Sequence, residues 1–470
     1  MHISNNTFLF TIYLVCAEIL SLHTPYNNLS IKQSLSVAND TVYFCPKDNC
    51  LQLRGNSLRN KTIVVEGDEV LNVSIKNLRT KNLIFQSNKT TYLTVHGNNK
   101  INHLVCHGQL DFNSKSEKDQ LIIYNDGYLS SLKCHGFFMH NGILTIQNKF
   151  DESKGVNCKE EFYIEKGIIN ITLKGASCRG IVCSKDAFFY GGVINIDFPD
   201  FILYKNAKSP KGIKIKSMGI FNGTNINCNG YIEEGIECNG DMTVESGIFN
   251  LHCLDDCIQT RGNLMVKGGN ISAIITKSSL LKERKYWKNH TGGDAIDSNK
   301  GITISGGYIY AVGGGKGDHA IDSEDSTIIT GGTVLAFGGI ERINNIPKLS
   351  FTTDSSYYQF IRKAKKENVR KVFLLNTNSE YKLLKNGKVY LTFITPKLAC
   401  EKIYIYLPGL EYNDEFEIFS GSGNSPDFIS GSVISVESGT QSPGGGRRKR
   451  AGEEFSRTRS GLGFESPACH

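Results

Sequence analysis

The chain has 470 residues, of which 39% are hydrophobic and 21% charged, so it can bury a sizeable core and is not globally disordered. Its 48 Gly against only 10 Pro exclude collagen and Pro-rich linkers and indicate many tight turns between short strands. The net charge of +7 includes +3 from residues 447–470, so the rest of the chain lacks the concentrated basic charge of a nucleic-acid binder.

The first 21 residues predict a signal peptide. Their apolar run, Phe8–Ala17, is too short to span a bilayer and is followed by small residues. A buried first strand is the alternative. We expect a secreted protein without a membrane span, and glycosylation sequons beyond this segment are compatible with that: they lie at Asn28, Asn39, Asn60, Asn72, Asn88, Asn170, Asn222, Asn270 and Asn289.

Residues 22–150 contain degenerate copies of a coil-like repeat. Leu104–Gly108 reads Leu-Val-Cys-His-Gly and recurs 28 residues later as Leu-Lys-Cys-His-Gly at Leu132–Gly136. Short alternating runs surround both copies. We therefore expect these residues to form the irregular first turns of the solenoid that the following segment predicts.

Residues 151–345 repeat one pattern, in which an apolar residue is followed by a glycine 11 residues later in six of seven copies and 10 in the third. The apolar positions are Val156, Ile181, Ile213, Ile236, Ile258, Ile296 and Ile321. The glycines are Gly167, Gly192, Gly223, Gly247, Gly269, Gly307 and Gly332. Alternating apolar residues lie on both sides of each glycine, which is a strand signal.

Successive copies begin 25, 32, 23, 22, 38 and 25 residues apart. Units this short cannot bury an apolar face alone, but stacked copies close a continuous core. The sequence therefore predicts an all-β parallel β-helix with loops in the two long intervals. Residues 346–437 predict a C-terminal β-rich cap, and residues 438–470, which are Gly/Ser-rich and then basic, predict a disordered tail.

The sharpest group of polar residues lies in two neighbouring coils. Asp297 and Asp322 each follow an aligned Ile, so stacking places them side by side, and Asp256 and Asp294 share another register. Neighbouring carboxylates repel unless a cation lies between them, and Ca²⁺ suits an extracellular oxygen site. The alternative is that these side chains only cap turns.

The 38-residue interval carries an insertion, Lys277–His290, with the only Trp of the chain. An exposed aromatic ring can lie on a sugar ring, and Lys or Arg can pair with a uronate carboxylate. The alternative is a solvated loop that Trp287 anchors by burial. The sugar-binding candidates are Lys282, Arg284, Lys285, Tyr286 and Trp287.

Twelve cysteines remain after the signal peptide and the tail, an even number that allows full disulfide pairing. Coil spacing would permit bridges between neighbouring coils, although packed thiols remain an alternative. The disulfide candidates are Cys45 with Cys50, Cys106 with Cys134, and Cys158 with Cys183. No motif specifies a catalytic triad, and a lyase base could come only from Arg261, Lys282 or Arg284.

The run Gly292–Gly339, with two Ala-Ile-Asp-Ser copies and Thr-Gly-Gly-Thr-Val-Leu-Ala-Phe-Gly-Gly, resembles the secreted carbohydrate-binding β-helix family best known from cellulolytic bacteria. Leu407–Gly421 resembles the segment that follows the helix in that family. The family is similar to pectate lyases, so the resemblance implies a right-handed helix, bound calcium and binding of plant-wall polysaccharides without established catalysis. The calcium candidates that the resemblance implies are Asp294, Asp297, Asp318 and Asp322.

We therefore expect a secreted, monomeric, calcium-dependent protein that binds an acidic cell-wall polysaccharide without cleaving it. One alternative is a calcium-assisted pectate-type lyase. Another is a disulfide-stapled structural or adhesion protein without a small ligand.

Overall fold

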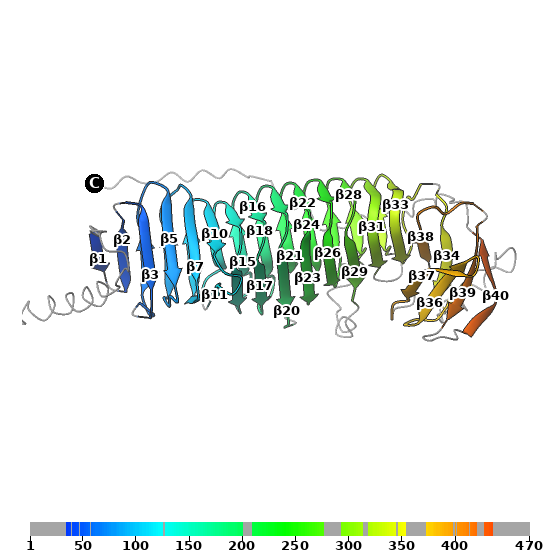
Figure 1. Ribbon diagram of the computed structural model, residues 1–470, viewed down its shortest axis with the longest axis horizontal. Coiled ribbons are helices and arrows are strands. Elements are labelled where there is room, and N and C mark those ends of the chain that lie inside the picture. The colour runs from blue at the N-terminus through cyan, green and yellow to red at the C-terminus, as the bar shows by residue number, and fades with distance from the viewer. Residues whose placement is uncertain are drawn as a thin grey trace, which may run out of the picture.

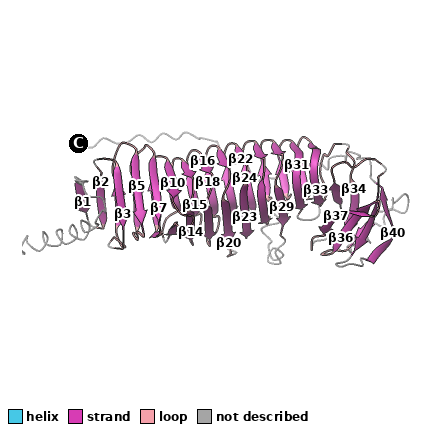
Figure 2. Ribbon diagram, in the orientation of Figure 1, coloured by secondary structure: helices cyan, strands magenta, loops and turns pink. Residues whose placement is uncertain are grey.

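A computed structural model describes residues 34–435 apart from 39, 47, 57, 126, 201–208, 277–292, 314–317, 345, 354–372, 398–399, 401, 413 and 421–426. Every regular element in this part of the chain is a strand (Figure 2). Figure 1 shows short strands stacked side by side along one axis, with a smaller group of strands at the C-terminal end. The predicted all-β solenoid with a β-rich cap is confirmed.

From residue 82 onward each coil contributes strands to three ladders, which we call faces A, B and C, whereas the first coils contribute to faces A and B only. Face A is the 13-stranded sheet, and its strands are β1 (Ser34–Ala38), β2 (Thr41–Cys45), β4 (Thr62–Val65), β6 (Asn82–Phe85), β9 (His103–Cys106), β12 (Ser130–Cys134), β15 (Lys154–Cys158), β18 (Arg179–Cys183), β21 (Lys211–Ile215), β24 (Glu234–Cys238), β27 (Ile258–Thr260), β30 (Ile296–Ser298) and β32 (Ile321–Ser323).

Faces B and C belong to one larger sheet because the long strands β31 (Ile302–Val312) and β33 (Thr327–Phe337) run through both. The other strands of face B are β3 (Cys50–Arg54), β5 (Leu71–Lys76), β7 (Thr91–His96), β10 (Leu110–Ser114), β13 (Phe137–Met139), β16 (Phe162–Ile164), β19 (Ala187–Phe189), β22 (Gly219–Phe221), β25 (Met242–Val244) and β28 (Leu264–Val266). Those of face C are β8 (Asn98–Ile101), β11 (Gln120–Asn125), β14 (Ile143–Asn148), β17 (Ile168–Leu173), β20 (Val193–Phe198), β23 (Thr224–Gly230), β26 (Gly247–Cys253) and β29 (Asn270–Ile275).

The coils stack in the register that the repeat predicts. All seven aligned apolar residues pair in series along face A, from Val156 with Ile181 to Ile296 with Ile321. In the earlier coils Leu132 pairs with Leu104, so the two Leu-x-Cys-His-Gly copies are also neighbours. The parallel pairing of consecutive coils therefore begins well before residue 151.

The glycine of each copy lies at the corner between faces B and C. All seven have a positive φ, between 76° at Gly192 and 126° at Gly247. At Gly307 a Cβ atom would also lie 2.7 Å from the backbone oxygen of Gly269 in the preceding coil. Glycine is the residue that tolerates both conditions, so the corners of the coils account for part of the glycine excess in the composition.

The interior of the solenoid is mainly apolar, with a few buried polar side chains such as Asn125, Ser131 and Asn148 that bond to one another. One cluster of buried hydrophobic side chains runs from Val42 to Ile343. It includes stacked phenylalanines, among them Phe137 and Phe162 at 5.4 Å and Phe189 and Phe221 at 4.3 Å between ring centroids. The side chains that point outward from the strands are therefore the ones available for a site.

The C-terminal strands close the end of the solenoid. Strand β38 (Ile403–Tyr406) pairs antiparallel with both β33 and β34 (Leu349–Thr353), and β34 pairs with β35 (Phe373–Leu375). A four-stranded sheet follows, with β36 (Glu380–Lys385), β37 (Lys388–Ile394), β39 (Glu415–Ser420) and β40 (Asp427–Ser435). A second apolar cluster joins these strands to Val312, Leu335 and Phe337 of the last coils.

The signal peptide and tail predicted at residues 1–21 and 438–470 lie outside the described residues. Within the described part, no helix has the length and apolar character needed to cross a bilayer.

Candidate functional site

Two columns of outward side chains, all polar except Val182, run along face A, and we call them together the charged belt. One column lies two residues before each aligned apolar residue and contains Lys154, Arg179, Lys211, Glu234, Asp256, Asp294 and His319. The other lies one residue after it and contains Asn157, Val182, Lys214, Glu237, Gln259, Asp297 and Asp322. The belt therefore changes from basic in the earlier coils to acidic in the last ones.

The basic and acidic parts of the belt meet at β21 and β24, where their side chains form a buried ion-pair cluster. Lys211 Nζ lies 2.7 Å from Glu234 Oε1 and 2.5 Å from Glu237 Oε2, and Lys214 Nζ lies 2.9 Å from Glu237 Oε1. Burial disfavours each charge, but the partners prevail: the glutamates raise the pKa of Lys211, and the lysines lower the pKa of Glu237. The cluster is internally compensated and does not need a ligand.

The acidic end of the belt holds four aspartates. Asp256, Asp297 and Asp322 are 0%, 4% and 5% exposed. Asp297 and Asp322 are direct register partners, as the sequence predicts. The backbone N–H of Asp294 donates to Asp256 Oδ1 at 3.0 Å. We call these four residues the acidic cluster.

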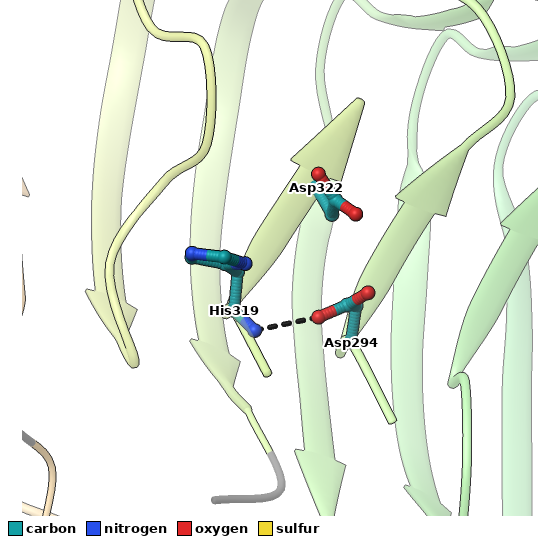
Figure 3. A group of neighbouring side chains, drawn as sticks. All are labelled: Asp294, His319 and Asp322. Atoms are coloured by element: carbon teal, nitrogen blue, oxygen red, sulfur yellow. Dashed lines mark hydrogen bonds between the residues drawn. The ribbon is translucent and has the colours of Figure 1, made fainter. Parts of the chain in front are cut away.

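The pKa of Asp294 is affected by the charges of the other three carboxyl groups. Burial raises its pKa well above the ordinary value, and the charges of Asp256, Asp322 and Asp297 raise it further. One hydrogen bond opposes this, from the backbone N–H of His319 to Asp294 Oδ1 at 2.5 Å (Figure 3). Mutual repulsion of this kind is what a bound cation would relieve.

His319 also contributes a side chain to this region. One ligand atom each from Asp294, His319 and Asp322 lie within 4.8 Å of one another, and Figure 3 shows the three side chains around a common space. Burial lowers the pKa of His319, although the charge of Asp322 opposes the shift, and its Nδ1 lies 3.7 Å from Glu341 Oε2. A neutral imidazole is the form that can bind a metal ion.

The donor atoms fit a divalent cation of the hard type. Carboxylate oxygens are the ligands that Ca²⁺ prefers, and Asp294 and Asp322 converge with two further aspartates beside them. An imidazole nitrogen is a poor calcium ligand and a common ligand of transition metals. The fit of this site to calcium therefore depends on the aspartates. His319 lies next to them and adds little to that fit.

Some of the predicted site residues lie together in the structure and others do not. Asp294, Asp297 and Asp322 come together, whereas Asp318 is not in the group that could share an ion. The five sugar-binding candidates Lys282, Arg284, Lys285, Tyr286 and Trp287 lie outside the described residues. His319 was not predicted as a ligand, although its place in the register of Asp294 is visible in the sequence.

The cysteines of face A occupy a structural position. All twelve described cysteines are free thiols, including Cys45, Cys50, Cys106 and Cys134. Cys134, Cys158 and Cys183 are consecutive register partners. The Cys158 thiol is placed to donate to the carbonyl oxygens of His135 and Glu161, at 3.0 and 2.8 Å. The predicted disulfides are not formed in this structure, and their formation stays a prediction.

The fold and the site define a parallel β-helix with a polar outer face that ends in an acidic cluster. A family model described as carbohydrate-binding domain-containing protein matches residues 90–340. The chain belongs to this family. No curated protein and no solved structure matches the chain. The carbohydrate-binding part of the expected resemblance is confirmed, while the likeness to pectate lyases and the calcium association stay predictions.

Proposed function

We propose that this protein is secreted and binds an acidic cell-wall polysaccharide with the help of a calcium ion, without cleaving it. The observation that carries the proposal is the family match over residues 90–340, because these coils contain the whole acidic cluster. A cation held by aspartates can also accept a carboxylate of a uronate, which links the ion to an acidic chain.

The position of the basic residues supports binding rather than catalysis. A lyase needs a base that faces the cation and the substrate. Arg261, the one described candidate, has Nη2 3.9 Å from Glu237 Oε1 in the ion-pair cluster. This contact places the Arg261 guanidinium beside the internally compensated part of the belt, and no catalytic step is proposed.

Calcium binding is tested on the purified full chain with two isosteric variants, Asp294→Asn and Asp322→Asn. We expect calcium to raise the melting temperature of the wild-type protein, since a ligand at 100 times its Kd stabilises by about 2.7 kcal/mol. Each variant should lose most of this shift. Asp325→Asn, which changes an exposed aspartate near the same coil, is the matched control.

The polysaccharide is tested by retention on immobilised polygalacturonate. We expect retention with calcium and release by a chelator, and weaker retention of both cluster variants than of the Asp325→Asn control. Retention that ignores both chelator and variants would show that the acidic cluster is not the binding site. Ultraviolet-absorbing unsaturated products from pectate would show instead that the protein is a lyase.

A further inference from the structure

A line of aromatic side chains lies on the outside of face B, away from the charged belt. Phe138, Tyr163 and Phe188 are the central residues of β13, β16 and β19, and each is partly exposed between two buried neighbours. They are direct register partners in consecutive coils. Tyr190 follows β19 and is 42% exposed. We call these four residues the aromatic stripe.

The four rings contact one another along the solenoid. The ring centroids of Phe138 and Tyr163 are 5.7 Å apart, and those of Tyr163 and Tyr190 are 5.5 Å apart. Phe188 and Tyr190 are nearly parallel, with an interplanar angle of 8° at 6.2 Å. The stripe is thus a continuous apolar ridge that crosses three coils.

In the following coils the same outward column alternates between apolar residues and threonines, in the order Ile220, Thr243, Met265, Thr303 and Ile328. The contiguous aromatic part is therefore confined to the stripe. Neighbouring exposed aromatic rings of this kind are typical of a binding surface. The direction of the stripe, parallel to the long axis, fits an extended partner rather than a compact one.

Polar groups flank the ridge where its aromatic part begins. His140 lies between Asp111 Oδ2 and Glu165 Oε2, with its ring nitrogens 3.2 and 3.1 Å from these oxygens, and its ring centroid is 6.3 Å from that of Tyr163. The three groups carry a net negative charge whether the imidazole is protonated or not. They can bond to hydroxyl groups but would repel a chain of carboxylates.

We propose that the aromatic stripe binds a neutral polysaccharide chain laid along the long axis of the solenoid. The apolar C–H faces of the sugar rings contact the aromatic rings, and the sugar hydroxyls bond to the flanking carboxylates. Consecutive coils are about 4.8 Å apart, roughly the length of one sugar residue in an extended chain. The column and its flanks also lie within residues 90–340, the part that matches the carbohydrate-binding family.

This second surface is separate from the acidic cluster, which lies on face A. The inference shares with the proposed function only the binding of a polysaccharide, and it needs no cation. The proposed function and this inference can therefore fail independently. Binding of calcium and polygalacturonate tests the acidic cluster, whereas binding of neutral glycans tests the aromatic stripe.

The experiment measures binding of the full chain to neutral soluble glycans, namely cello-oligosaccharides, xylan, glucomannan and galactomannan, by calorimetry with a chelator present. The variant Tyr163→Ala/Tyr190→Ala removes two rings of the stripe. The control is Tyr124→Ala on β11 of face C, because Tyr124 is also 42% exposed. Tyr163→Phe/Tyr190→Phe keeps the rings and removes only the hydroxyls.

We expect at least one neutral glycan to bind the wild-type protein in the absence of calcium, and the double alanine variant to bind it about tenfold or more weakly. The Tyr124 variant and the phenylalanine variant should stay within about twofold of the wild type. Unchanged melting temperatures will show that each variant is folded. Binding of none of the neutral glycans, or equal binding by the double alanine variant and the control, would overturn the inference. A change in oligomeric state without a change in glycan binding would show that the stripe joins two copies of the chain.

Discussion

Lys211 shows how one residue holds two coils together through charge. Its side chain is buried on the outside of face A, and it bonds to Glu234 and Glu237 of the next coil. Buried charges are costly unless they are paired, so removing one partner costs more than the pair contributes. The ion-pair cluster therefore constrains which substitutions the belt tolerates.

Replacing Lys211 with methionine should destabilise the protein by about 3 kcal/mol, because Glu234 and Glu237 stay buried without their shared cation. Chemical denaturation of the wild type and the variant measures this difference. Lys214→Met is the control, since Lys214 is more exposed and contacts only Glu237 of the two glutamates, so its loss should be smaller. Recovery of stability in Lys211→Met/Glu234→Met would confirm the mechanism, and no loss in Lys211→Met would contradict it.

At the scale of the element, several strands of face A end in a small side chain that bonds to a turn carbonyl. Cys158 and Cys183 occupy this position in the middle coils, and Thr260 and Ser298 occupy it in later ones. The Thr260 and Ser298 hydroxyls both donate to the carbonyl oxygen of Gly262 at 2.9 Å. The thiols therefore donate hydrogen bonds to turn carbonyl oxygens in their coils, as the hydroxyls do in the later coils.

This equivalence predicts that Cys158→Ser changes the free energy of unfolding by less than about 1 kcal/mol, whereas Cys158→Val costs about 1 kcal/mol more because it leaves the turn carbonyls without their donor. Denaturant titration under reducing conditions compares the two variants. Mass spectrometry of the untreated protein checks whether Cys158 is free. A larger loss for serine than for valine would contradict the equivalence.

The elements also show what the sequence could and could not predict. Register was predictable because Ile296 and Ile321 mark the same position in their coils, which placed Asp297 beside Asp322. The aromatic stripe was missed because Phe138, Tyr163 and Phe188 lie in triplets that were used only as a strand signal, although their spacing of 25 residues equals one coil. The place of His319 beside Asp294 and Asp322 was not predicted because the expected cation site was built from carboxylates alone.

At the scale of the whole molecule, the cap controls the end of the stack. Antiparallel pairing with β38 covers Val334–Phe337 of the last coil, and bridges from Ile340 and Ile343 cover Ile321 and Thr327. An uncovered edge offers free backbone groups to other chains. The cap thus covers the edge at which another chain could pair with the last coil.

A chain truncated after residue 345 should therefore associate or aggregate, since it exposes this edge and the apolar side chains of Leu335 and Phe337. Light scattering during size-exclusion chromatography measures the mass as a function of concentration. A chain truncated after residue 435 keeps every described strand and serves as the control. A monodisperse, monomeric protein after truncation at residue 345 would show that the cap is dispensable.

The first pair of strands is antiparallel as well, since β1 runs against β2 while the following coils are parallel. With antiparallel strands at both ends of the described solenoid, the number of coils sets its length. Duplication of one unit of about 25 residues would lengthen it by about 4.8 Å and add one residue to every outward column. The charged belt and the aromatic stripe can then diverge one coil at a time, so a longer ligand could be accommodated without a new fold.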